Sequence, residues 1–90
     1  MTEPSAGTTP TDPEPRVAHE VDATGLSCPM PVIELAKAVQ GVAVGELVGL
    51  TATDPAARVD VPVWCRMQRH VLRAMTGSDG SWHFLVERAR

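Results

Sequence analysis

Two prolines separated by one residue limit where helices and strands can lie in the first half of this 90-residue chain. Proline fixes φ and lacks an N–H, so it fits the first turn of a helix and disrupts a helix interior or a central strand. Pro29 and Pro31 therefore indicate a helix start. The helix begins at Pro29 or at Pro31, because proline at 31 disfavours helical geometry at Met30. In both cases Cys28 lies near the helix N-terminus.

Apolar periodicity predicts the other elements. A period of two predicts strands, and a spacing of three or four predicts helices. The first expected element is a strand over 17–23, with Val17, His19, Val21 and Ala23 on one face. The helix after Cys28 follows, with Val32, Leu35, Ala36 and Val39 on one face. A strand over 46–53, a helix from about Val61 to Arg69, and two strands over 71–75 and 81–87 joined by a turn over 76–80 complete the order. A short turn at Asp54-Pro55 precedes the second helix.

Three local features add detail to these elements. Gly41 is expected to close the first helix in the left-handed conformation. Val63 or Trp64, with Met67 and Val71, is expected to form the buried stripe of the second helix. The last strand turns its aromatic face toward the core through Trp82, Phe84 and Val86.

The order strand, helix, strand, helix, strand, strand predicts an α/β (α+β) fold. Two helices cover one face of so small a sheet, so we expect a two-layer sandwich with a four-stranded mixed sheet. Residues 17–90 then form a single domain. Residues 1–16 are rich in Pro and Thr and lack periodicity, which predicts a flexible tail. A dispensable extension and a partner-docking arm both remain open for that tail.

Charge and hydropathy exclude several functions. The chain has eight Lys and Arg and eleven Asp and Glu, which gives a net charge of −3. A negative charge is the wrong sign for a protein that binds nucleic acid directly. The first residues lack the apolar segment of a signal peptide, and no apolar run approaches a membrane span. We therefore expect a cytoplasmic protein. Its two cysteines are then thiols, because cellular reductants oppose disulfides.

Cys28 is the candidate reactive residue. A helix N-terminus favours an anion and commonly lowers the pKa of a cysteine, so we expect a thiolate that attacks a persulfide sulfur. Gly25 and Leu26 place the thiol in a strand-to-helix loop, where functional residues concentrate. The alternative is a buried, inert cysteine. Neither a cofactor nor a metal is needed, and the spacing of His19, His70 and His83 is not that of a zinc site.

The chain resembles the TusA/SirA-type sulfur carriers. The matching segments span nearly all of residues 17–90, with Cys-Pro-X-Pro the most specific: Asp22-Ala23-Thr24-Gly25-Leu26-Ser27-Cys28-Pro29-Met30-Pro31, Gly45-Glu46, Asp54-Pro55-Ala56 and Asp60-Val61-Pro62-Val63-Trp64-Cys65. The resemblance implies a sulfurtransferase-type carrier, acting with partners, in which Cys28 accepts sulfur as a persulfide. It also implies a cysteine desulfurase or rhodanese-like donor, an acceptor protein, and a docking surface on the helix after Cys28. Family acceptors serve tRNA thiolation, molybdenum-cofactor assembly and sulfur oxidation, so the motif does not select one.

The site-shaping residues expected around Cys28 are Pro29, Met30, Pro31, Gly25, Leu26 and Asp60. Asp60 either orients the site or caps a helix at Val61, and capping is the commoner use. Cys65 is expected in the core, with a resolving thiol as the alternative. A basic cluster contains Arg66, Arg69, His70 and Arg73. We expect it to be a solvated face, and the alternative is a docking site for an acidic partner or RNA.

Two other functions remain open. A non-catalytic protein- or RNA-binding regulatory module would tolerate Cys28→Ala. A redox sensor would form a reversible disulfide between Cys28 and Cys65.

Overall fold

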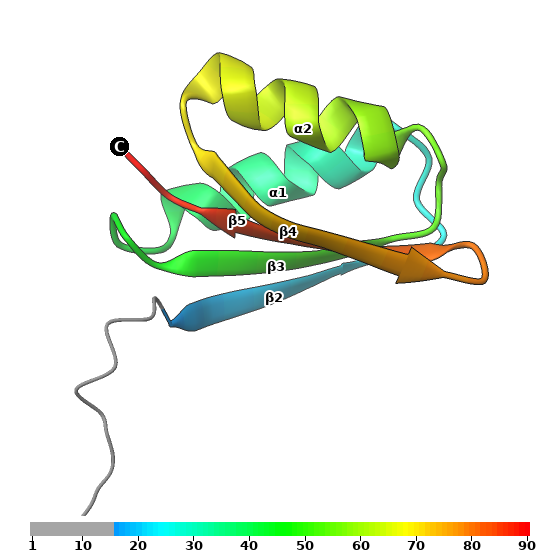
Figure 1. Ribbon diagram of the computed structural model, residues 1–90, viewed down its shortest axis with the longest axis horizontal. Coiled ribbons are helices and arrows are strands. Elements are labelled where there is room, and N and C mark those ends of the chain that lie inside the picture. The colour runs from blue at the N-terminus through cyan, green and yellow to red at the C-terminus, as the bar shows by residue number, and fades with distance from the viewer. Residues whose placement is uncertain (1–15) are drawn as a thin grey trace, which may run out of the picture.

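The predicted order of strands and helices is confirmed. The computed structural model of the protein describes residues 16–90, and the expected flexible tail lies outside this range except for Arg16. The elements are β2 (Val17–Ala23), α1 (Met30–Gln40), β3 (Leu47–Ala52), α2 (Ala57–Gln68), β4 (Val71–Ser78) and β5 (Ser81–Glu87). Both helices lie on the same face of the sheet, which gives the expected two-layer sandwich (Figure 1).

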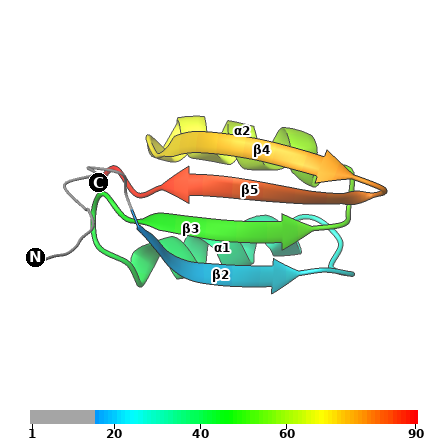
Figure 2. The same ribbon diagram turned by 60° about the horizontal axis from the view of Figure 1, so that its bottom comes forward.

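The sheet is mixed, with the order β2-β3-β5-β4. β2 and β3 are parallel because α1 crosses over between them, whereas β5 pairs antiparallel with both β3 and β4. The β4–β5 hairpin turns at Asp79 and Gly80, both with positive φ, as a two-residue hairpin loop requires. The carboxyl ends of β2 and β3 therefore lie at the same end of the sheet as this hairpin (Figure 2).

The first strand contains an irregularity that the alternating pattern does not reveal. Val17 pairs with Leu47, and His19 pairs with the next residue of β3, Val48. The additional residue, Ala18, is a β-bulge, so Val17 does not share the face of His19 and Val21. The expected alternation therefore holds only from His19 onward.

Helix α1 buries Pro31, Leu35 and Val39, which are four residues apart and lie on one face. The left-handed conformation predicted for Gly41 is wrong, because its φ is −91° and its ψ is −1°. The Gly41 N–H donates to the Ala38 carbonyl at 3.0 Å. Arg88 also donates from Nη1 to the Gln40 carbonyl at 3.4 Å, so the end of the helix is capped without a left-handed residue.

Helix α2 begins at Ala57, four residues before the predicted start. The Asp54 carboxylate accepts a hydrogen bond from the Ala56 N–H at 3.0 Å, and the Asp54 carbonyl accepts from the Ala57 N–H at 3.0 Å. These bonds order the turn at Asp54-Pro55 and let the helix start there. Pro62 consequently lies inside the helix and does not mark its start.

The earlier start also explains which side chains of α2 are buried. Ala57, Val61 and Cys65 face the sheet. The predicted stripe is wrong at Val63, Met67 and Val71, which are 40%, 73% and 42% exposed. Trp64, the alternative to Val63, is partly buried against the core. The helix continues through 57–60, so its inward face is set by the contacts of Ala57 and Val61 with the sheet.

The core forms one cluster between the helices and the sheet. The largest fully buried side chains are Phe84, Leu35, Leu50, Val39, Val48, Val61, Val86 and Pro31. Phe84 and Val86 are fully buried and Trp82 packs against the same cluster, which confirms the predicted inner face of β5. The apolar layer thus fixes how α1 and α2 sit above the sheet, and with them the loops at their N-termini.

Candidate functional site

Cys28 lies in the loop that joins β2 to α1, directly before the helix. A turn opens this loop, with the Leu26 N–H donating to the Ala23 carbonyl at 3.1 Å. Gly25 occupies the turn with a φ of +81°, a conformation that other residues rarely adopt. The sequence after β2 thus leads the chain from the sheet toward the helix layer, and Cys28 is half-buried at the junction.

Two hydrogen bonds join this loop to the loop between β3 and α2. The Gly25 N–H donates to Oγ1 of Thr53 at 2.9 Å, and the Cys28 N–H donates to Oδ2 of Asp54 at 2.8 Å. The N–H groups of Cys28 and Ala56 favour the charged carboxylate, which lowers the pKa of Asp54. The backbone beside the thiol is therefore held by groups 26 and 28 residues further along the chain.

The two prolines have different roles. Pro29 is exposed, follows a cis peptide bond and is the N-cap of α1. Pro31 is the second helical residue and is buried in the core, so it anchors the start of the helix. Neither proline has an N–H, and the Met30 N–H already donates to the Ser27 carbonyl at 2.9 Å. The helix N-terminus consequently has few amides left for a thiolate.

The protonation of Cys28 differs from the sequence-based prediction. Partial burial raises the pKa of the Cys28 thiol to about 11. The nearby Asp60 carboxylate and the charge of Asp54 raise the pKa further. The expected lowering of this pKa by the helix N-terminus is therefore wrong. Partial burial and two carboxylates from elements distant in sequence raise the pKa of the thiol at a helix start that has few free N–H groups.

The expected site-shaping residues occupy distinct positions around the thiol. Leu26 and Met30 flank it on the chain and are 36% and 41% exposed. Asp60 lies in the first turn of α2, and it contributes to the raised pKa of the Cys28 thiol. The N-cap of that helix is Ala56, so the capping role predicted for Asp60 is wrong.

Sequence reasoning missed the contribution of Thr53 and Asp54 to this site, because Asp54 was assigned only to the turn before the second helix. One signal was present in the predicted topology. Parallel strands that are each followed by a helix bring their carboxyl ends to the same edge of the sheet, where functional loops meet. The residues after β2 and those after β3 were therefore candidates for one site.

Cys65 is buried in the core, as the core interpretation predicts, with 2% of its surface exposed. Burial raises the pKa of its thiol to about 11. Both cysteines are free thiols. Among residues 16–90, no three His, Cys, Asp or Glu side chains are grouped so as to hold a metal ion.

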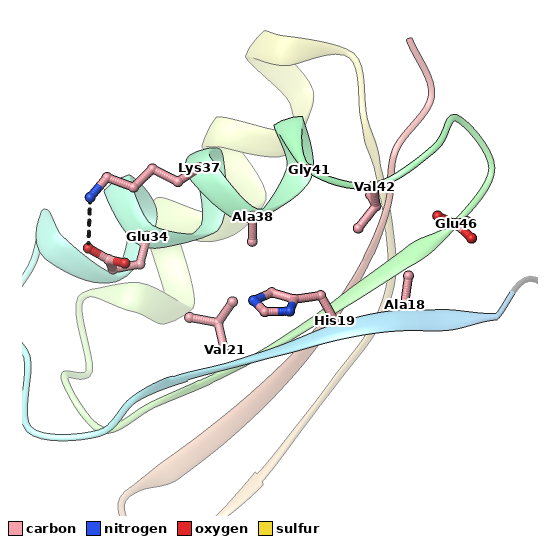
Figure 3. Close-up of a pocket in the computed structure, with 9 residues that line it drawn as sticks. All are labelled: Ala18, His19, Val21, Glu34, Lys37, Ala38, Gly41, Val42 and Glu46. Carbon is pink, nitrogen blue, oxygen red and sulfur yellow. Dashed lines mark hydrogen bonds and ion pairs between the residues drawn. The ribbon is translucent and has the colours of Figure 1, made fainter.

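A groove of about 450 Å³ lies elsewhere, between β2 and α1 (Figure 3). His19 and Val21 point into it from the strand, and Lys37 pairs with Glu34 at its helix side at 3.4 Å. None of its lining residues belongs to the loops around Cys28. We therefore base the functional site on the chemistry of the thiol and not on this groove.

The basic residues near the end of α2 do not act as one group. Arg69 is the left-handed residue that closes α2, and Arg73 pairs with Glu87 on the neighbouring strand. Nδ1 of His70 accepts a hydrogen bond from the Ala89 N–H at 3.1 Å. Arg66 remains exposed. No helix within residues 16–90 has the length and apolar character needed to cross a membrane.

The fold and the loop thiol together define a class of small two-layer sandwich proteins. A SirA-like protein from Desulfitobacterium hafniense has the same fold, with a TM-score of 0.70 and 20% identity over 80% of this chain and 99% of that one. The model of the family described as "Sulfurtransferase TusA" matches residues 19–88. The chain therefore belongs to the TusA sulfurtransferase family, which confirms the resemblance found in the sequence. Membership implies partners in a sulfur relay.

Proposed function

We propose that Cys28 is the residue on which this protein carries sulfur. One observation carries the proposal: of the two cysteines, Cys28 is half-buried in a loop that partners can reach, whereas Cys65 lies in the core. A sulfur carrier must present its thiol to both a donor and an acceptor. Only Cys28 meets this requirement.

The proposed reaction is a transfer of one sulfur atom between thiols. The Cys28 thiolate attacks the terminal sulfur of a persulfide on the donor, a cysteine desulfurase or a rhodanese-like protein. A new S–S bond forms on Cys28, the donor S–S bond breaks, and its electron pair stays on the donor sulfur. The proton lost by Cys28 ends on that donor thiolate. The transfer to an acceptor repeats the exchange in the opposite direction, with no net oxidation.

The surroundings of the thiol support docking by partner proteins. Leu26, Met30 and Ile33 leave 36%, 41% and 41% of their surfaces exposed on the loop and the first turns of α1. Exposed apolar side chains next to a reactive group are typical of contact surfaces. We propose that donor and acceptor bind over this apolar rim. A cytosolic location remains part of the proposal, since a reducing compartment keeps both thiols free.

The test is the intact mass of the protein after incubation with a cysteine desulfurase and cysteine, followed by peptide mapping with and without reductant. We expect a reducible gain of one sulfur on the Cys28 peptide. Cys28→Ser should abolish the gain. Cys65→Ala should retain it, and alanine is used here because a serine hydroxyl would be buried without a partner.

Other results would point to other functions. Equal loss in both variants would indicate a dithiol mechanism. An intramolecular disulfide after oxidation would favour a redox sensor. An absence of loading with several donors, together with partner binding that survives Cys28→Ala, would favour a non-catalytic binding module.

A further inference from the structure

We propose that a polar pocket at the end of the molecule opposite Cys28 binds a free tetrahedral oxyanion such as inorganic phosphate or sulfate. The pocket has a volume of about 270 Å³ and lies where the segment after β5 passes the C-terminal ends of α1 and α2 (Figure 1). Its lining residues are Gln40, Gln68, His70, Arg88 and Arg90. Cys28 precedes α1, whereas the pocket lies at the end of that helix, so its ligand is independent of the sulfur chemistry proposed for Cys28.

Every side chain that lines the pocket carries hydrogen-bond donors. The two arginines and the two glutamines supply N–H groups, and no Asp or Glu of the described residues belongs to the lining. His70 also supplies a donor. Its Nδ1 accepts the Ala89 N–H at 3.1 Å, so the proton of the neutral ring lies on Nε2. Donors without carboxylates favour an anion over a cation or an apolar molecule.

Backbone carbonyls hold both arginine side chains in place. Arg88 donates from Nη1 to the Val42 carbonyl at 2.6 Å and from Nε to the Arg90 carbonyl at 2.8 Å. Arg90 donates from Nη1 to the Gln68 carbonyl at 3.1 Å. A guanidinium has several more N–H groups, so these bonds position it and leave donors for a ligand. The same bonds offset the partial negative charge of the helix ends, which would otherwise repel an anion.

No acidic side chain in the described part of the chain neutralises these arginines. None of the ion pairs among residues 16–90 includes Arg88 or Arg90. The backbone of Glu46 pairs with that of Arg88, but the Glu46 carboxylate accepts the Ala43 N–H at 2.8 Å. Burial lowers the pKa of His70, and the charges of Arg90 and Arg88 lower it further, so the positive charge reaches the pocket.

The size and lining of the pocket favour a small ligand. Its volume lies below the range of about 300–1,000 Å³ that is usual for pockets of drug-sized molecules. No apolar side chain among the described residues lines it, so a ligand with a large apolar part would gain little from binding there. A free oxyanion matches both the size and the donors.

The experiment titrates the isotope-labelled full chain with sodium phosphate at pH 7.5, with the ionic strength held constant by sodium chloride. NMR follows the side-chain amides of Gln40 and Gln68 and the backbone amide of Ala89. We expect saturable shifts of these resonances, and competition by sulfate. Saturating sulfate should also move the titration midpoint of His70 to higher pH, because a nearby anion favours the protonated ring.

Two substitutions and a matched control locate the binding. Arg90→Gln removes one guanidinium from an exposed residue and should weaken phosphate binding about tenfold, the loss expected for one charge-assisted hydrogen bond. Arg90→Lys should lose less affinity, because the charge remains. The control is Arg58→Gln, which removes the same charge from the first turn of α2, at the other end of that helix. It should bind phosphate like the parent protein.

Other results would overturn the proposal. Shifts that do not saturate, or that chloride alone reproduces, would show only general screening of charge. Equal losses of affinity in Arg90→Gln and Arg58→Gln would show that the anion responds to net charge and not to this pocket. Tighter binding of adenosine monophosphate than of phosphate would assign the pocket to a nucleotide and not to a free oxyanion.

Discussion

Gly49 in β3 and Gly77 in β4 both lie beneath a side chain of a neighbouring strand, yet they tolerate different changes. The Glu20 carboxylate crosses over Gly49 and reaches Nε2 of His83 at 3.1 Å. A methyl group at residue 49 would first meet the flexible end of that side chain. At Gly77 it would meet the indole ring of Trp82 and the Ser81 carbonyl oxygen, at 2.8 Å from the oxygen.

We therefore predict that Gly77→Ala lowers the free energy of unfolding by about 1–3 kcal/mol, as overpacking does. Gly49→Ala should change it by no more than about 0.5 kcal/mol, because displacement of Glu20 offsets the entropy that alanine saves in a strand. Urea unfolding of both variants measures the difference. Equal losses at the two positions would contradict this account of the contacts.

At the scale of elements, the segment after β5 joins the C-terminal ends of both helices. Arg88 donates from Nη1 to the Val42 carbonyl at 2.6 Å, and Arg90 donates from Nη1 to the Gln68 carbonyl at 3.1 Å. Cations near a helix C-terminus stabilise its free carbonyls. Between these arginines, the Ala89 N–H donates to His70, so the segment is held along its length. We name residues 88–90 the C-terminal clasp.

The C-terminal clasp should weaken in acid. Burial lowers the pKa of His70 below 6.5, and the charges of Arg90 and Arg88 lower it further. The folded state thus favours neutral His70, and this contribution to stability is complete above pH 6.5 and is lost as the pH falls through the folded pKa. A protonated ring cannot accept the Ala89 N–H.

We predict that hydrogen exchange of the Ala89 amide accelerates, relative to the intrinsic exchange rate, as the pH is lowered from 7 to 5. His70→Gln should remove most of this pH dependence, whereas His19→Gln on β2 should leave it in place. Protection that does not vary with pH in the parent protein would contradict the role assigned to His70.

At the scale of the whole molecule, the described residues share one core, and both tryptophans contact it from different layers. Trp64 belongs to α2 and Trp82 to β5, and both pack against the same buried cluster. No separate core remains in the described residues to stabilise the helix layer without the sheet. Domains of this size with a single core usually unfold in one cooperative transition.

We therefore expect Trp64→Phe and Trp82→Phe, each with one remaining tryptophan, to unfold in urea with fluorescence and circular-dichroism midpoints that coincide within each variant. Two separate midpoints in either variant would show that the helix layer and the sheet unfold independently. The comparison within a variant is needed because each substitution also changes stability.

Local sequence determined the elements and the fold class of this protein. Alternating side chains, helical spacing and proline positions act over a few residues, and they were sufficient for the order of strands and helices, the inner face of β5 and the place of Cys28 before α1. The sequence motifs also led to the family. These signals depend on backbone preferences that are independent of distant contacts.

The tertiary structure decided the properties that depend on residues far apart in the chain. The start and buried face of α2 follow from the bonds of Asp54 and the packing of Ala57 against the sheet. The raised pKa of Cys28 follows from its partial burial and from the charges of Asp60 and Asp54, which lie on elements distant in sequence. A helix N-terminus seen in sequence predicts a thiolate, but the charges around a thiol in space set its pKa.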